Sequence, residues 1–173
     1  MIVLGIDPGP VTHGAVLYDS AARRVLWSHK AIESIDLETK VNTLHGAGLR
    51  PFRIVVERPA AMGVIGVGMA GHMLDTAWVA GRLAGVLGEV HALKIETMTR
   101  RQVLRHLGVM SGKGSADSRV RAACIADHET PGGPPAVGRK AAPGPLYGVS
   151  SHAWQALGLV LAWLEIYEEE GEE

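Results

Sequence analysis

Three short apolar runs open the chain and have the length and composition of β-strands. They cover residues 2–6, 14–18 and 25–29. A DPGP turn follows the first run, and a polar turn over residues 19–24 separates the second from the third. Runs joined by such turns lie next to each other in a sheet, so the pattern predicts an antiparallel meander.

The rest of the chain alternates between helical and strand-like patterns. The spacing of apolar residues predicts helices over residues 32–44, 72–87, 99–107, 117–128 and 151–167, strands over residues 53–57 and 90–95, and a long Pro- and Gly-rich loop over residues 130–148. The last helix is apolar almost all round, which is typical of a buried helix. The pattern predicts an α/β fold with a mixed five-stranded sheet flanked by helices, as a single domain over residues 1–167 with an acidic tail at 168–173.

Composition and charge bear on the possible partners and the cellular compartment of the protein. The 173 residues carry a formal net charge of -1, so any anionic partner must be bound by a local basic patch. Cys124 is the single cysteine and lies in an apolar-periodic stretch, which predicts a buried, inert thiol and suits a reducing compartment. No leader or apolar run of membrane-spanning length is present, so we expect a soluble, cytoplasmic protein.

Two acids occupy equivalent places at the ends of predicted strands. Asp7 follows the first apolar run and Glu57 ends the fourth, and a proline follows each within two residues. Functional side chains of α/β sheets gather beyond such strand ends, where two carboxylates repel each other unless a cation neutralises them. Together the acids favour a Mg²⁺ or Mn²⁺ site, because hard cations prefer oxygen ligands. The alternative is that Asp7 begins a turn and Glu57 pairs with Arg58 at the surface.

The last predicted helix concentrates its polar side chains in its first turn. His152 and Gln155 are three residues apart and share one helix face, whereas the residues after Gln155 are apolar for almost three turns. Polar groups clustered at the start of a buried helix point to a common site, which can hold a metal or a phosphate. In the alternative interpretation, Ser151 caps the helix and His152 is an ordinary hydrogen-bonded histidine.

Four segments in order resemble one known family. LGIDPG, VVER, SGKGSADSRV and SHAWQALGLVLAW together resemble the RuvC-type Holliday junction resolvases of the ribonuclease H-like superfamily. The resemblance implies a ribonuclease H-like fold and a homodimer that nicks four-way DNA junctions symmetrically. It also implies two metal ions, Mg²⁺ or Mn²⁺, in each active site. Two-metal hydrolysis of a phosphodiester predicts products with 5′ phosphates.

The resemblance assigns a site and also exposes a departure from the family pattern. Asp7 and Glu57 match the family's first two acids, and His152 matches a position that is Asp or His. Gln155 stands where the family has a further Asp, and a neutral amide can bind a metal through its carbonyl oxygen but cannot neutralise charge. Three hypotheses remain open: weakened metal binding with retained activity, an inactive or engineered variant, or compensation by another acid such as Asp117, whose alternative role is a helix N-cap.

The remaining predictions concern DNA and the dimer. The DNA-binding candidates lie between residues 100 and 140 and are Arg100, Arg101, Arg105, Lys113, Ser115, Arg119, Arg121, Arg139 and Lys140. Alternatively, the basic residues belong to solvated helix faces. Ala60 lacks the aromatic side chain that some family members carry three residues after the second acid. The resemblance places the dimer contact on the helix over residues 72–87.

Two other functions compete with a junction-cleaving nuclease. With Gln155 in the site, the protein could bind junctions without cutting them. The GIDPG segment also occurs in the phosphate loop of actin-like kinases and ATPases, but those proteins need two lobes and this chain is too short for them.

Overall fold

The computed structural model describes residues 1–48, 53–59, 67–91 and 95–171. Its strands are β1 (Ile2–Asp7), β2 (Thr12–Asp19), β3 (Arg24–Glu33), β4 (Arg53–Arg58), β5 (Ile95–Thr99), β6 (Gly138–Arg139) and β7 (Ala142–Pro143). Its helices are α1 (Ser34–Gly46), α2 (Val67–His91), α3 (Arg100–His106), α4 (Ala116–His128) and α5 (Ala153–Gly171).

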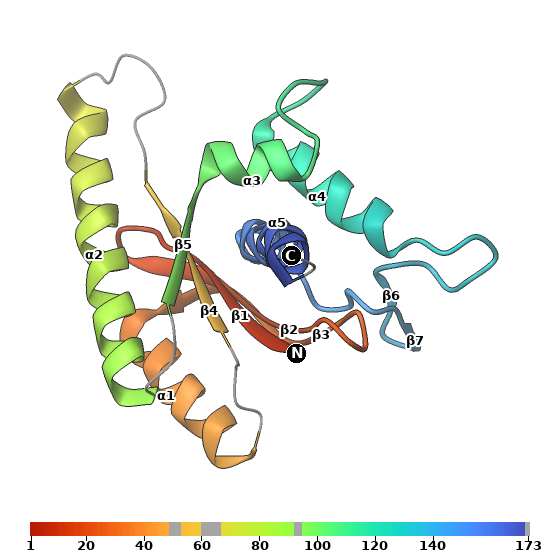
Figure 1. Ribbon diagram of the computed structural model, residues 1–173, viewed down its shortest axis with the longest axis horizontal. Coiled ribbons are helices and arrows are strands. Elements are labelled where there is room, and N and C mark those ends of the chain that lie inside the picture. Colours follow the sequence, from red (N-terminus) through yellow and green to blue (C-terminus); the bar gives the residue numbers. More distant parts are fainter. Residues whose placement is uncertain (49–52, 60–66, 92–94, 172–173) are drawn as a thin grey trace.

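A five-stranded mixed sheet in the order β3-β2-β1-β4-β5 forms the centre of the fold, as the sequence predicts. The strands β1, β2 and β3 form the predicted antiparallel meander, whereas β4 and β5 run parallel to β1. Figure 1 shows α1 and α2 on one face and α3, α4 and α5 on the other. This arrangement brings the carboxyl ends of three parallel strands to one edge of the sheet.

Each face of the sheet buries its own apolar cluster, and β1 contributes to both. Val3 points into the cluster beneath α5, whereas Leu4 and Ile6 point into the cluster beneath α1 and α2. All three are fully buried. A central strand covered on both faces needs a continuous apolar run, which explains the opening pattern of the sequence.

Helix α5 lies directly on β1 and is buried along most of its length. Every residue from Ala153 to Val160 is buried, which confirms the expectation from its all-round apolar sequence. A Cβ atom added at Gly5 would overlap the carbonyl oxygen of Ala156 and the Val160 side chain, so a larger residue would push the helix off the strand. The helix runs to Gly171 and therefore includes part of the acidic run placed in the tail.

Several predicted boundaries are wrong. The fifth strand is Ile95–Thr99 rather than 90–95, because α2 continues through His91; residues 92–94 lie outside the described part. Residues 32–33 extend β3 instead of starting a helix. The last helix begins at Ala153, since Ser151 has a positive φ of 47° and cannot belong to a right-handed helix. The loop over 130–148 contains the small β6–β7 hairpin.

Two further expectations concern Cys124 and membranes. The Cys124 side chain is buried, and burial raises the pKa of its thiol to about 12, so it stays protonated at neutral pH. In the described part of the chain, no helix combines the length and the apolar character needed to cross a membrane.

Candidate metal centre

The edge of the sheet brings the two strand-end acids together. β1 and β4 are hydrogen-bonded neighbours in parallel, with Ile6 paired to Val56, so Asp7 and Glu57 follow side by side. The side chains of Asp7 and Glu57 are only 17% and 14% exposed. The structure therefore places two largely buried carboxylates at the carboxyl ends of adjacent strands.

Burial leaves both acids poorly stabilised as anions. Removal from water raises the pKa of Asp7 from 3.8 to about 7, with Arg100 opposing the rise. The pKa of Glu57 rises from 4.5 to about 7, mainly through burial and then through repulsion from Asp7, against the attraction of Arg100. A divalent cation between the two groups would favour their charged forms.

The turn before α5 adds His152 to this edge. Its Nδ1 lies 3.4 Å from Oδ2 of Asp7. Gly14 on β2 permits this approach, because a Cβ atom there would overlap the carbonyl oxygen of His152 and crowd its Cβ. The Ser151 residue ahead of it sits in the turn with left-handed backbone geometry. Glycine at position 14 therefore sets how close His152 comes to the carboxylates.

Gln155 is buried with half of its amide unsatisfied. Its side chain amide Nε2 lies 3.5 Å from the backbone carbonyl oxygen of Asp117, while its Oε1 is buried without a hydrogen-bond partner. The residue is 5% exposed. A buried amide carbonyl left without a donor is costly and is a competent ligand for a hard cation.

Arg100, which the sequence analysis proposes as a DNA contact, is the cation in this cluster, a placement beside the acids that the sequence reasoning did not anticipate. It follows β5 directly, and its guanidinium pairs with Glu57 at 3.5 Å and also with Asp117 on α4. The predicted strand at 90–95 ended too early to show that Arg100 lies at the same edge as the two acids. With β5 at its observed place, the strand-end argument extends to Arg100.

Ser115 and Asp117 lie at the start of α4. Ser115 is the N-cap of α4, where its Oγ accepts a hydrogen bond from the Ser118 amide at 3.2 Å. Asp117, for which a cap was the alternative role, lies in the first turn instead. Its charge raises the pKa of both Asp7 and Glu57, so it belongs electrostatically to the same site.

The donor set fits Mg²⁺ or Mn²⁺, although its side chains are not arranged as a closed ligand shell. Among the described residues, no three Asp, Glu, His or Cys side chains form a ready metal site. Instead, Arg100 supplies positive charge next to Glu57 and Asp117. Carboxylate oxygens, one imidazole and the unpaired Gln155 carbonyl are the ligand types that these cations accept.

Two cavities are lined by residues of this cluster or next to it. A cavity of about 510 Å³ is lined by Asp117, His152 and Gln155 together with neighbouring residues of α4 and the turn before α5. A second, of about 230 Å³, lies between Glu57, the Pro8 turn and His72 of α2. The candidate centre is therefore reachable from solvent.

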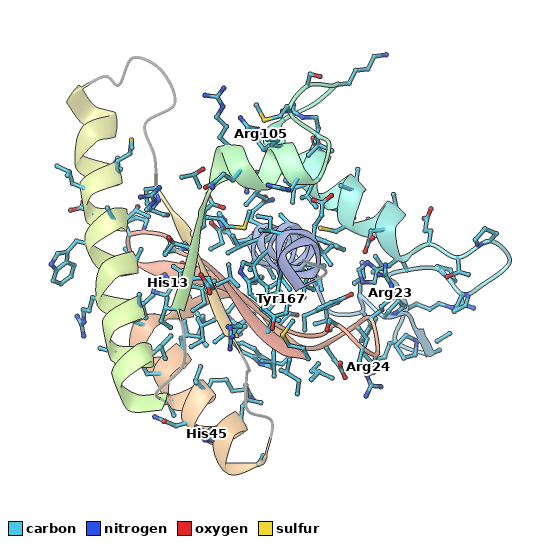
Figure 2. The ribbon with its side chains drawn as sticks, viewed as in Figure 1. His13, Arg23, Arg24, His45, Arg105 and Tyr167 are labelled. Atoms are coloured by element: carbon cyan, nitrogen blue, oxygen red, sulfur yellow. The ribbon has the colours of Figure 1, made fainter. Side chains whose placement is uncertain are left out.

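The other predicted DNA-binding residues lie in two regions, of which the first comprises α3, the loop after it and α4. Arg121 is exposed on α4. Arg101 and Arg105 are exposed on α3, and Lys113 is exposed in the following loop. Arg119 instead holds that loop, since its guanidinium donates to the carbonyl oxygens of Val109 and Gly114 at 2.9 and 2.7 Å. Figure 2 shows Arg105 pointing outward from α3.

The second region is the hairpin β6–β7. Arg139 and Lys140 are exposed there, in a segment that packs beside β3 through hydrogen bonds from the Val25 amide to Pro145 and from Ser28 to Gly148. In Figure 1 the hairpin lies away from α3. The predicted basic cluster is thus divided between two regions of the surface.

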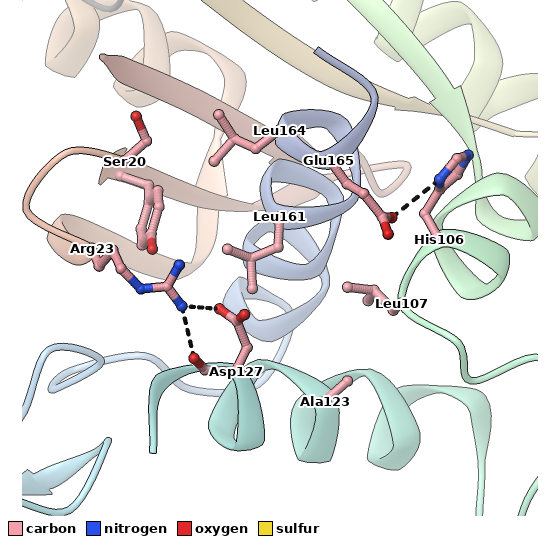
Figure 3. Close-up of a pocket in the computed structure, with 10 residues that line it drawn as sticks. Ser20, Arg23, His106, Leu107, Ala123, Asp127, Leu161, Leu164 and Glu165 are labelled. Atoms are coloured by element: carbon pink, nitrogen blue, oxygen red, sulfur yellow. Dashed lines mark hydrogen bonds and ion pairs between the residues drawn. The ribbon is translucent and has the colours of Figure 1, made fainter. Parts of the chain in front are cut away.

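Another cavity, of about 330 Å³, lies near the C-terminal half of α5 (Figure 3). Its charged side chains are already paired with each other: Arg23 with Asp127 at 2.9 Å, and His106 with Glu165 at 3.1 Å. The candidate metal centre surrounds the other end of α5. These pairs therefore tie α3, α4 and the β2–β3 turn to α5 or to each other.

Comparison with known proteins agrees with this architecture. No protein-family model and no curated protein sequence matches the chain. Two solved structures of RuvC from Thermus thermophilus do match in structure. One, in complex with a Holliday junction substrate, has a TM-score of 0.57 and 20% identity, covering 98% of this chain and 96% of the other. The second has a TM-score of 0.55 and 19% identity, covering 98% and 97%. The chain therefore has the ribonuclease H-like α/β fold of RuvC.

Proposed function

We propose that this protein is a metal-dependent, structure-selective DNA endonuclease that resolves four-way junctions by paired nicks leaving 5′ phosphates. The observation that carries the proposal is the pair of buried carboxylates, Asp7 and Glu57, on adjacent parallel strands of a RuvC fold. The T. thermophilus RuvC structure with its Holliday junction substrate supports the choice of branched DNA. A nuclease that acts on DNA junctions would work in the cytoplasm, the location expected from the sequence.

Asp7 and Glu57 would hold the divalent ions, Mg²⁺ or Mn²⁺, with His152 and the Gln155 carbonyl completing the protein's ligands. Two bound ions would activate water and stabilise the leaving 3′ oxygen of a phosphodiester. The protein's own contribution is orientation: the β1–β4 register fixes the acids, and the tight contact at Gly14 fixes His152. Burial of the acids limits their contact with bulk water.

Contacts to the DNA backbone would come from exposed basic residues, including Arg121, which lines the cavity with His152 and Gln155. Arg101, Arg105 and Lys113 supply positive charge on α3 and in the loop after it. Because the overall charge is near zero, binding depends on such a local patch. Arg139 and Lys140 on the hairpin would contact a separate DNA arm.

Paired nicks require two active sites, and α2 offers a surface for a homodimer. Leu74 and Trp78 lie one turn apart on this helix and are 71% and 66% exposed. The guanidinium of Arg82 lies 5.9 Å from the Trp78 ring centre. Large apolar side chains next to each other on an outer helix face are typical of an association surface, which supports the dimer contact expected over residues 72–87.

A nicking assay tests the proposal. A labelled four-way junction and a duplex of the same sequence are incubated with the protein in Mg²⁺ and in Mn²⁺, for the wild type, Asp7→Asn and Gln155→Asp. We expect the wild type to nick the junction in pairs, leaving 5′ phosphates, and Asp7→Asn to bind it without nicking. Equal cutting of the duplex would refute structure selectivity.

Gln155 favours one second candidate, a module that binds junctions without cutting them. If only Gln155→Asp cuts, this second function is correct for the native chain. If neither protein cuts either substrate, the nuclease proposal is wrong.

A further inference from the structure

A third carboxylate lies beside the proposed metal centre and is not among the ligands assigned above. Asp117 occupies the first turn of α4, and its side chain pairs with the same guanidinium that pairs with Glu57. Arg100 thus stands between acids contributed by β4 and α4. The electrostatic influence of Asp117 also reaches Asp7 on β1.

The backbone of Asp117 is held in place, whereas its side chain is largely exposed and is held through its pair with Arg100. Val120, one turn further along α4, packs so closely on Gly158 of α5 that a Cβ atom there would overlap it. Gln155 Nε2 reaches the Asp117 carbonyl oxygen at 3.5 Å. The Asp117 side chain itself is 67% exposed, so its carboxylate can reorient without unpacking the helix.

The unpaired carbonyl of Gln155 is an independent sign that a ligand belongs here. Its Oε1 is buried and has no hydrogen-bond donor, although Gln155 and Asp117 line the same cavity. A cation in that cavity would satisfy this oxygen. Arg100 donates to Glu57 and Asp117 and not to Oε1 of Gln155.

We infer that Asp117 is a third carboxylate ligand of the metal centre, and that Arg100 is the counterion that the divalent cation displaces. Because Gln155 is neutral, Asp7 and Glu57 alone bring two negative charges, and Asp117 supplies a third. A guanidinium close to a divalent cation is repelled by it, so a bound metal would favour movement of Arg100 away from Glu57 and Asp117. The inference rests on the proposed function, since it concerns the same metal centre.

Mn²⁺ binding by the full chain tests the inference without relying on cleavage. Titrations followed by the electron paramagnetic resonance signal of free aqueous Mn²⁺ give the affinity, and circular dichroism checks folding. We expect Asp117→Asn to weaken binding by about tenfold, since ligand charge sets the affinity of such sites. We expect Arg100→Gln to tighten binding severalfold, because no counterion has to be displaced.

The matched control is Asp127→Asn. Asp127 is also on α4 and is also paired with an arginine, Arg23, but it lines the cavity at the other end of α5. Its substitution should leave Mn²⁺ affinity unchanged. If Asp127→Asn weakened Mn²⁺ binding as much as Asp117→Asn does, loss of any acid on α4 would be enough to lower the affinity, and the inference would be overturned.

The double variant Asp117→Asn/Arg100→Gln separates a ligand from a residue that only holds Arg100. If Asp117 is a ligand, the double variant binds Mn²⁺ about tenfold more weakly than Arg100→Gln. Equal Mn²⁺ affinities of the double variant and Arg100→Gln would overturn the inference. So would an Asp117→Asn variant that binds Mn²⁺ as tightly as the wild type while Asp7→Asn binds none. Both results leave the proposed function intact. Failure of the wild type to bind Mn²⁺, even with junction DNA present, would refute the metal centre itself.

Discussion

Replacing Asp7 by Asn should stabilise the metal-free protein, because the folded chain holds this carboxylate in a place where its charge is unfavourable. The pKa of Asp7 rises from 3.8 to about 7 on folding, mainly through burial. Between these two values the folded state binds more protons than the unfolded state. The free energy of unfolding therefore falls as the pH rises through this window, and the loss is complete above the folded-state pKa.

The size of the effect follows from the same two pKa values. One pKa unit corresponds to about 1.4 kcal/mol. With a pKa of 3.8 in the unfolded state and about 7 in the folded state, ionisation of Asp7 makes the free energy of unfolding roughly 2 to 3 kcal/mol lower at pH 8 than at pH 5. Removing that charge also relieves Glu57, whose pKa Asp7 raises. The gain in unfolding free energy from Asp7→Asn should therefore be larger at pH 8 than at pH 5 by roughly 2 to 3 kcal/mol.

Urea unfolding in EDTA, followed by tryptophan fluorescence, measures this difference. Trp154 and Trp163 are buried in the cluster beneath α5, so their emission reports on the core. Buried His13 and His128 have lowered pKa values and also change stability with pH, but they do so equally in both proteins. The exposed Glu129→Gln is the control and should match the wild type at both pH values.

The reasoning fails if Asp7→Asn is no more stable than the wild type at pH 8, or if its advantage is the same at pH 5. Either result would mean that the Asp7 carboxylate is well stabilised without a metal. Its burial at the strand end would then give no reason for a cation site.

Three further substitutions test separate parts of the account. Gly14→Ala should move the turn of His152 away from Asp7 and lower metal-dependent nicking at least tenfold with the fold retained, as measured by initial rates and circular dichroism. Arg105→Ala should weaken junction binding and reduce the slope of log affinity against log salt by about 0.9, whereas Arg24→Ala on β3 should change neither in fluorescence anisotropy. Leu74→Glu should convert a dimer to a monomer in analytical ultracentrifugation; an unchanged mass would remove α2 as the interface.

The sequence is most informative where apolar runs are continuous. The strands β1 and β4 are buried on both faces, so their cores are uninterrupted and their ends are marked by Asp7 and Glu57. Because parallel neighbours end at the same edge, the strand pattern alone predicts that these acids meet. The all-round apolar pattern of α5 likewise predicts its burial.

The fifth strand shows where the pattern fails. β5 is an edge strand in which Met98 is the only fully buried residue, so it has no apolar run to mark it. The residues just before it are more apolar, so the sequence pattern predicts the strand there, although Val90 and His91 belong to α2. This shift of a few residues hides the place of Arg100 at the site.

Contacts between elements that are far apart in the chain could not be predicted from the sequence either. The pairing of Arg100 with Asp117 depends on how α4 packs against α5, and no local spacing encodes it. The same packing leaves the carbonyl of Gln155 without a partner. Sequence reasoning identifies Gln155 as the departure from the family pattern and Asp117 as an acid that could compensate for it, and the structure places both residues in the lining of one cavity.

The central claim is that Asp7 and Glu57 share a divalent cation at the edge of the sheet. The most direct measurement is an anomalous difference map from crystals of the protein grown with Mn²⁺. We predict a peak between the Asp7 and Glu57 carboxylates, with the Arg100 guanidinium turned away from Glu57. A map with no peak at this edge, or with Mn²⁺ only at other acids such as Asp127 and Glu165, would contradict the account.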